Sequence, residues 1–220
     1  MKKIALFIFL LFTFCTYAQK QNNTYNSDSK LNVFIAPLPL IDVFDGSSIR
    51  LGVDFKVNRK FRAAIESGTY FSTIDAYKIN PRGFIIKPEI KFKVYENDHS
   101  KQFIGIEYQY KEQSYDFKDS ISVVEGVNYE MQYKINRKMN CISLKCISLQ
   151  NLSEKITFEY FFGIGIRFLR SKNNLSDEEN DGILDDEIHG GTQAEYQIRP
   201  IGKINTVNLI AGIRFGYKIF

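Results

Sequence analysis

The sequence predicts an all-β fold: an eight-stranded antiparallel up-and-down barrel. Apolar and polar residues alternate with a period of two through most of the chain, helical spacing never persists, and short and long connections follow one another in turn. The composition agrees, with 19 Phe, 13 Tyr, no Trp and 5 Pro among 220 residues. Aromatic residues are enriched in strands and Pro is depleted, so this composition favours a strand-rich protein.

Eight segments carry the alternation and define the predicted strands. In chain order they cover residues 31–38, 48–57, 61–71, 84–95, 103–111, 129–149, 158–168 and 207–220. The first is the weakest. The segment 129–149 is irregular, because its alternation changes phase between Asn136 and Asn140, and we predict a β-bulge at that point.

The connections between these segments are of two kinds. Short ones are predicted at 58–60, 96–102 and 151–155, and long ones at about 39–47, 72–83, 112–128 and 171–204. Short turns at one end and long loops at the other are typical of barrels in the bacterial outer membrane. An even number of strands leaves both termini on the side of the short turns, which is the periplasmic side.

The N-terminal residues 1–18 have the features of a secretory signal peptide. Two lysines precede the apolar stretch 4–14, and Thr16 and Ala18 supply the small residues of a cleavage site. The stretch is too short for a membrane anchor, the alternative interpretation. Cleavage lowers the formal net charge from +4 to +2, which argues against nucleic-acid binding. Residues 19–30 are then expected as a short periplasmic segment before a barrel formed by 31–220.

Alternation does not say which face points inward, and a soluble lipocalin-like barrel has the same period. Three features favour a transmembrane barrel with its apolar face toward lipid. The polar face carries glycines, which make room for long side chains in a narrow interior. It also mixes opposite charges that can pair across the lumen, and the apolar face is rich in aromatics suited to interfacial girdles. The charged residues are Arg50, Asp54, Arg62, Glu66, Lys87, Glu89, Glu107, Lys111, Glu159 and Arg167. The glycines are Gly52, Gly68, Gly105, Gly163, Gly165, Gly212 and Gly216. The tyrosines expected in the girdles are Tyr108, Tyr110, Tyr160 and Tyr217.

The last predicted strand ends "AGIRFGYKIF", with the aromatic Phe220 as the final residue. In this the chain resembles the bacterial outer-membrane β-barrels, whose closing strand typically ends in an aromatic. Tyr217 and Ile219 depart from the family pattern, because they do not alternate in step with Phe220. The resemblance covers 31–220 and is one of architecture, to OmpX-like and OmpA transmembrane-domain-like barrels and to porin-family barrels of uncharacterised function. It implies an outer-membrane location, contact with outer-membrane lipid, and recognition of the C-terminal strand by the barrel-assembly machinery.

The sequence gives little support for an enzyme. General-base catalysis usually needs a His beside a nucleophile or carboxylate, and the two histidines, His99 and His189, are both in predicted connections. Glu89 and Glu107 are expected to form structural ion pairs with neighbouring Lys and Arg. Cys141 and Cys146 have an odd spacing that places them on opposite faces of one strand, so no disulfide is expected between them.

The stretch "SDEENDGILDDEIHGG" (176–191) in the longest connection resembles calcium-binding loops. Asp177, Glu179, Asp181 and Asp185 fall at ligand positions 1, 3, 5 and 9 of an EF-hand loop, with a glycine at the sharp turn. Position 12 is Ile188, where EF-hands carry a bidentate Glu. The alternatives are a weak extracellular Ca²⁺ site and a solvated acidic loop, and no other cofactor is expected.

Three functions remain open from the sequence. The first is a small outer-membrane barrel with a side-chain-filled, non-conducting lumen and extracellular loops that bind a partner or stabilise the membrane; eight strands leave no aqueous channel. The second is a small-solute channel or transport barrel. The third is a soluble exported barrel that encloses an apolar ligand.

Overall fold

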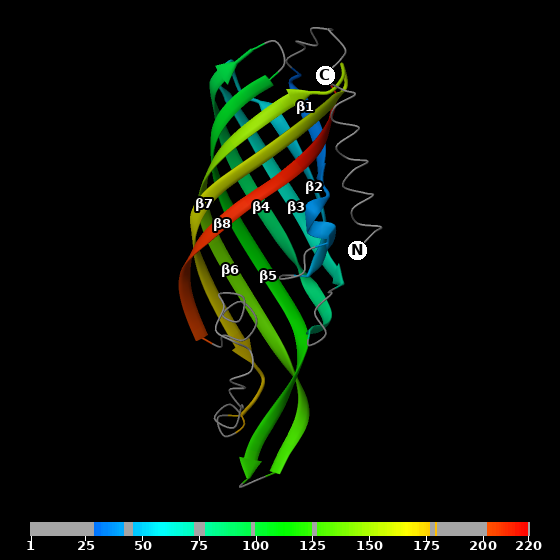
Figure 1. The fold of residues 1–220 in the computed structure, drawn as a ribbon, viewed down its shortest axis with the longest axis vertical. Coiled ribbons are helices and arrows are strands. Elements are labelled where there is room, and N and C mark those ends of the chain that lie inside the picture. The colour runs from blue at the N-terminus through cyan, green and yellow to red at the C-terminus, as the bar shows by residue number, and fades with distance from the viewer. Residues whose placement is uncertain are drawn as a thin grey trace, which may run out of the picture.

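The computed structural model describes residues 29–41, 46–72, 78–97, 100–124, 127–176, 179 and 202–219 (Figure 1). The predicted signal peptide, the residues 19–28 that follow it and Phe220 lie outside this range. The elements are β1 (Leu31–Ala36), η1 (Leu38–Ile41), β2 (Ser47–Lys56), β3 (Phe61–Ser72), β4 (Lys78–Glu96), β5 (Ser100–Val124), β6 (Val127–Asn151), β7 (Ile156–Asn173) and β8 (Gly202–Lys218). No helix in the described part of the chain has the length and apolar content needed to cross a membrane.

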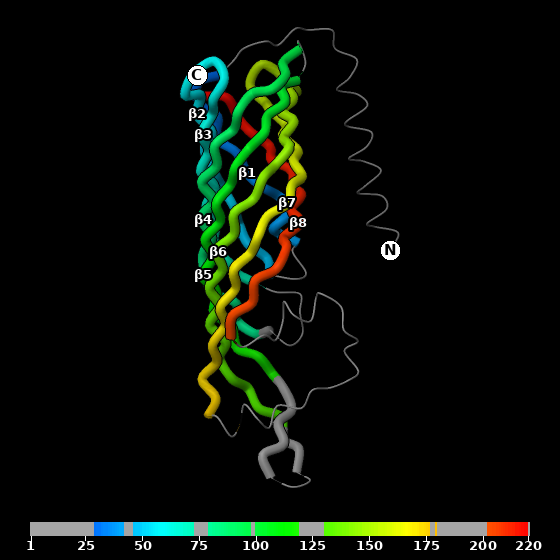
Figure 2. The backbone as a smooth tube through the Cα atoms, turned by 90° about the vertical axis from the view of Figure 1, so that its left-hand side faces the viewer, coloured from blue at the N-terminus to red at the C-terminus, as the bar shows by residue number. Residues whose placement is uncertain are grey.

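The eight strands form a closed antiparallel barrel in sequence order. Each strand pairs with the next, and β1 closes the ring against β8 through Val33↔Tyr217 and Ile35↔Phe215. The predicted up-and-down barrel is therefore confirmed. Figure 2 shows the strands running side by side along a long, narrow body.

Side chains of Asn and Ser shape the three short turns. Asn58 Oδ1 accepts hydrogen bonds from the backbone N–H groups of Lys60 and Phe61, at 2.8 and 2.9 Å. Asn97 Oδ1 accepts one from the N–H of Ser100, and Ser153 Oγ accepts one from the N–H of Ile156. These side chains accept hydrogen bonds from backbone N–H groups of the turns. The bonds stabilise the turns, so the strands can reverse direction within a few residues.

The apolar residues face outward and the charged residues face inward along the central part of every long strand. On β7, Tyr160, Phe162, Ile164 and Ile166 are exposed while Glu159 is buried. On β4 and β5 the carboxylate and ammonium groups of Glu107, Lys91 and Glu89 are at most 2% exposed, whereas Ile90 and Ile106 are 62% and 61% exposed. The arrangement is the reverse of a barrel that encloses an apolar ligand.

The outward apolar surface has the height of a bilayer core. On β7 it runs from Ile156 to Phe168, which is about 30 Å along the barrel axis for strands tilted by about 40°. The predicted girdle tyrosines lie at two levels on the strands, Tyr160 and Tyr217 near the short turns and Tyr108 and Tyr110 near the opposite end. At that opposite end the ring of Tyr110 packs on that of Phe84, with 5.8 Å between ring centroids.

Two predictions about the middle of the chain are wrong. Residues 112–128 are not a loop: β5 and β6 continue as a paired hairpin to Val124↔Val127, and they extend beyond the other strands at the lower end of Figure 1. No bulge lies between Asn136 and Asn140, because pairing with both neighbouring strands is continuous there.

The change of phase in the sequence has a different cause. The inward positions of β6 remain odd-numbered from Tyr133 to Leu149. The inward residues are Tyr133 and Ile135 on one side of this point and Ser143 and Lys145 on the other. The side-chain geometry is constant, and the polarity of the two faces is exchanged. A one-residue register slip is therefore not needed to explain the pattern.

Candidate functional site

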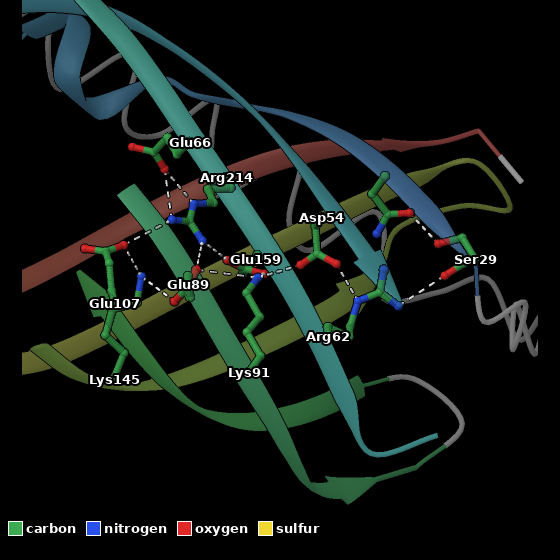
Figure 3. A network of polar contacts seen from close by, with 11 residues as sticks. Ser29, Asp54, Arg62, Glu66, Glu89, Lys91, Glu107, Lys145, Glu159 and Arg214 are labelled. Carbon is green, nitrogen blue, oxygen red and sulfur yellow. Dashed lines mark hydrogen bonds and ion pairs between the residues drawn. The ribbon is translucent and has the colours of Figure 1, made fainter. Parts of the chain in front are cut away.

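A network of buried charges fills the middle of the barrel (Figure 3). Among the described residues it contains five carboxylates and five cations, which come from strands β2 to β8 and are all at most 6% exposed. They are Asp54, Glu66, Glu89, Glu107, Glu159, Arg62, Lys87, Lys91, Lys145 and Arg214. A buried charge is tolerated only when it is paired and hydrogen-bonded. The balanced composition supplies such partners.

Arg214 of β8 is the centre of the network. Its Nη1 donates to Glu89 Oε2 and to Glu159 Oε1, both at 2.7 Å. Its Nε donates to Glu66 Oε2 at 2.9 Å, and Nη2 lies 3.5 Å from Glu107 Oε2. Since β8 lies opposite β4 in the ring, the contact with Glu89 crosses the full width of the lumen. One guanidinium therefore links the walls of the barrel.

Two lysines connect the same carboxylates to other strands. Lys145 Nζ lies 2.5 Å from Glu89 Oε1 and 2.7 Å from Glu107 Oε2. Lys91 Nζ lies 2.5 Å from Glu159 Oε2 and 2.8 Å from Asp54 Oδ2. Each ammonium group bridges two carboxylates, so the ion pairs form one connected set rather than isolated pairs.

The network extends at both ends. Toward the short turns, Arg62 Nε lies 2.5 Å from Asp54 Oδ1. On the other side, Lys87 Nζ lies 3.4 Å from Glu107 Oε1 and 3.8 Å from Glu66 Oε1. The sequence-based expectation that Glu89 and Glu107 form structural ion pairs is confirmed. Glu159, in contrast, pairs with cations of other strands, because Arg167 is eight residues away on its own strand, or about 27 Å.

Two aromatic rings pack against the Arg214 guanidinium. Its Cζ lies 4.7 Å from the ring centroid of Phe34 and 4.8 Å from that of Phe161, within the range of cation–π attraction. Lys145 Nζ also lies 4.1 Å from the centroid of Phe161. Both aromatic side chains point inward, and the sequence analysis did not identify them as lumen residues.

Glycines on the facing strands leave room for these side chains. A Cβ atom at Gly52 would overlap the ring of Phe34, and one at Gly212 would lie 3.0 Å or less from three atoms of the Phe161 ring. Gly68 serves the stem of Arg50 in the same way, since a Cβ there would lie 2.6 Å from Arg50 Cγ. The predicted role of the polar-face glycines is therefore confirmed, with aromatic rings as well as charged side chains using the space.

Little room remains within the network. A cavity beside Arg214, Asp54 and Glu159 has a volume of about 10 Å³, which is about the space of one water molecule. Nearer the short turns, Phe103, Ile147, Leu149 and Phe161 form an apolar cluster. The lumen thus contains an apolar cluster beside the charged network, on the side of the short turns.

The hairpin of β5 and β6 forms the second unusual region, which we call the arm (112–124 and 127–139). On its inner face the apolar residues Tyr115, Phe117, Tyr133 and Ile135 are at most 4% exposed and pack together, with Leu175 against them. Gln113 and Arg137 are buried nearer the barrel, and Arg137 Cζ lies 5.7 Å from the ring centroid of Tyr115. The rings of Phe117 and Tyr133 lie 5.9 Å apart. The outward positions carry polar residues instead, so the arm resembles an ordinary water-exposed sheet with one buried face.

Of the predicted calcium ligands, only Glu179 is described; Asp177, Asp181 and Asp185 lie outside the described residues. The Glu179 carboxylate accepts hydrogen bonds from the N–H and the hydroxyl of Ser176, at 2.8 and 2.9 Å, while the Glu179 N–H donates to Ser176 Oγ. This is a capping box, and the bonds from Ser176 hold the pKa of the Glu179 carboxyl below its usual value. The described residues contain no group of three or more metal-ligating side chains, and the calcium site stays a prediction.

The histidines and cysteines singled out in the sequence complete the set. His99 and His189 lie outside the described residues. Cys141 is buried and Cys146 is exposed, and both are free thiols, which confirms that they face opposite sides of β6.

Comparisons with known proteins add little. No family model matches the chain, and no curated protein matches it. Among solved structures, the chain is similar to the N-terminal β-barrel domain of OprF from Pseudomonas aeruginosa, with 8% sequence identity and a TM-score of 0.35, covering 85% of this chain and 93% of that domain. The class of protein is therefore defined by the structure itself: a closed eight-stranded barrel with a charged interior and an apolar exterior.

Proposed function

We propose that the protein is an outer-membrane β-barrel that does not conduct, and that it presents the β5–β6 arm outside the cell as a binding element. The membrane location is supported by the exposed apolar surface. Side chains such as Ile164 and Leu209 are 55% and 79% exposed in the central band. In water, a continuous apolar surface of this extent would drive aggregation, whereas acyl chains solvate it.

The observation that carries the non-conducting function is the network around Arg214. Its contacts join β8 to β3, β4, β5 and β7, and the rings of Phe34 and Phe161 pack against the guanidinium. A small solute or hydrated ion could pass only if several buried ion pairs separated together. Breaking a buried pair is costly, because it leaves charges without partners.

The arm supports a role in binding. Pairing between β4 and β5 ends at Lys78↔Phe117, and pairing between β6 and β7 ends at Ile135↔Asn173. Beyond these points the backbones of 118–124 and 127–133 pair only with each other among the described strands, while the N–H of Lys134 donates to Asn174 Oδ1 at 2.8 Å. Each therefore presents an outer edge, and such edges accept an extended segment of a partner chain.

Fractionation combined with planar-bilayer recording tests the proposal. The expected result is a protein in the outer-membrane fraction that migrates differently on gels when boiled, and that gives no conductance steps in a bilayer. Discrete conductance steps in the wild type would support the channel alternative instead. Recovery of the protein in a detergent-free soluble fraction would contradict the membrane assignment.

A further inference from the structure

Three cations stand side by side on the outer wall of the barrel. Lys138 of β6 pairs directly with Arg170 of β7, and Arg170 pairs directly with Lys203 of β8. All three side chains are exposed and point outward. Like charges directly opposite one another on a sheet destabilise it, so a row of three calls for a compensating anion.

The described surroundings supply only part of that compensation. Glu112 of β5 lies next in the same row, and its Oε1 is 3.1 Å from Lys138 Nζ. Arg170 and Lys203 form no ion pair with any described residue, and Lys172 adds a further exposed cation two residues beyond Arg170. The row therefore carries a net positive charge.

The row lies where the outer surface changes from apolar to polar. On β7 the outward residues are apolar up to Phe168, and Arg170 follows; on β6 the outward Leu144 and Ile142 give way to Asn140 and then Lys138. In the membrane orientation proposed above, this level is that of the headgroups of the outer leaflet.

An apolar groove lies below the row on the same strands and β5, with one outward row, Asn140, Phe168 and Asn205, between the two. It has a volume of about 460 Å³ and is lined by Ile106, Ile142, Leu144, Ile164, Ile166 and Val207. Arg170, Phe168 and Ile166 are successive outward residues of β7, and Ile166 lines the upper end of the groove. The distance along the strand from Arg170 to Ile166 is four residues, or about 13 Å. A cationic row above an apolar groove matches a lipid with an anionic head and acyl chains.

We propose that this outer wall binds a phosphorylated lipid of the outer leaflet, with its phosphate against Lys138, Arg170 and Lys203 and an acyl chain in the groove. The site depends on the proposed membrane location. A free anion would compensate the cations but would leave the groove unexplained. The same is true of the acidic connection between β7 and β8. A lipid accounts for both, and lipid phosphates attract basic side chains at a membrane surface.

The test uses the full-length barrel refolded in neutral detergent and measures binding of diphosphoryl lipid A by native mass spectrometry. The site variant is Lys138→Gln with Arg170→Gln and Lys203→Gln. The matched control is Arg59→Gln with Lys60→Gln and Lys155→Gln, which removes three exposed cations at the short turns. We expect the site variant to bind on the order of 100-fold more weakly and the control to bind like the wild type.

Further arms separate the components of the site. Dephosphorylated lipid A is expected to bind as weakly to the wild type as the diphosphoryl form binds to the site variant. Val207→Trp, which fills the groove, is expected to weaken lipid binding without affecting the phosphate contacts. Inorganic phosphate in millimolar excess should not compete, since it cannot occupy the groove.

Several outcomes would overturn the proposal. They are equal binding by the site variant and the control, full competition by inorganic phosphate, or lipid binding that emerges only after the acidic residues of 177–187 are changed to amides. The last result would assign the cations to that connection. The mobility shift on boiling, read on the same samples, distinguishes this failure from that of the proposed function, because a folded barrel without lipid binding refutes only the site.

Discussion

Residues 100–111 and 112–124 of β5 belong to one strand, yet they bury opposite kinds of side chain. In the first part Glu107 and Lys111 point inward and Ile106 points outward; in the second part Tyr115 and Phe117 point inward. Side-chain direction alternates without interruption from Lys101 to Lys118, across the boundary between the two parts. With the proposed membrane location, the comparison means that the solvent outside the wall, lipid or water, decides which residues a strand must enclose.

The two regions also differ in how their interiors hold together. The lumen uses connected ion pairs that depend on exact partners, whereas the arm uses apolar packing between neighbouring strands. Loss of one lumen partner leaves several charges buried without compensation. Loss of one arm residue leaves a local cavity.

The largest effect is expected from Arg214→Met. This change removes the cation that contacts four buried carboxylates, and we expect the free energy of unfolding to fall by about 3–5 kcal/mol. Urea unfolding in lipid vesicles measures it. Lys155→Met, at an exposed turn, is the control and should unfold like the wild type. A loss in Arg214→Met no larger than in the control would show that the network does not stabilise the barrel.

A smaller effect is expected from Gly212→Ala. The added methyl group overlaps the Phe161 ring that packs on Arg214, and the expected loss is about 1–3 kcal/mol in the same assay. Phe161→Leu combined with Gly212→Ala should lose less than the sum of the two single changes, because the smaller side chain relieves the overlap. Strict additivity would mean that the two residues do not share this space.

The smallest effect on the barrel is expected from Phe117→Ala in the arm. Its ring packs on Tyr133 beyond the apolar outer band of the barrel, so the midpoint of global unfolding should stay close to that of the wild type. Proteolysis and hydrogen exchange of 112–139 should increase strongly instead, since the arm opens locally. A large shift of the global midpoint would show that arm and barrel unfold as one unit.

The sequence was sufficient to predict the strands of the barrel and their faces, because the two-residue period defines the strands, and paired charges with glycines on one face indicate a packed interior. It was not sufficient for the arm. Polar residues at outward positions, such as Lys138, led to the interpretation of this segment as a loop and a bulge. The polarity of the two faces changes along the strand although the strand geometry does not. The partners in the network also depend on the closed ring: Arg214 meets Glu66, 148 residues away in the chain. The inward rings of Phe34 and Phe161 lacked a sequence signal, because an aromatic on either face of a strand fits the composition.

Accessibility of spin labels along β6 in lipid vesicles tests the central claim most directly. Single cysteines at Leu144 and Gln132, two outward positions of the same strand, are labelled with a nitroxide after Cys141→Ser and Cys146→Ala. At Leu144 we expect frequent collisions with dissolved oxygen and few with a water-soluble nickel chelate, and at Gln132 the reverse. Equal exposure of both labels to the nickel chelate, or shielding of the Leu144 label from oxygen, would contradict a barrel whose apolar wall faces lipid and whose arm stands in water.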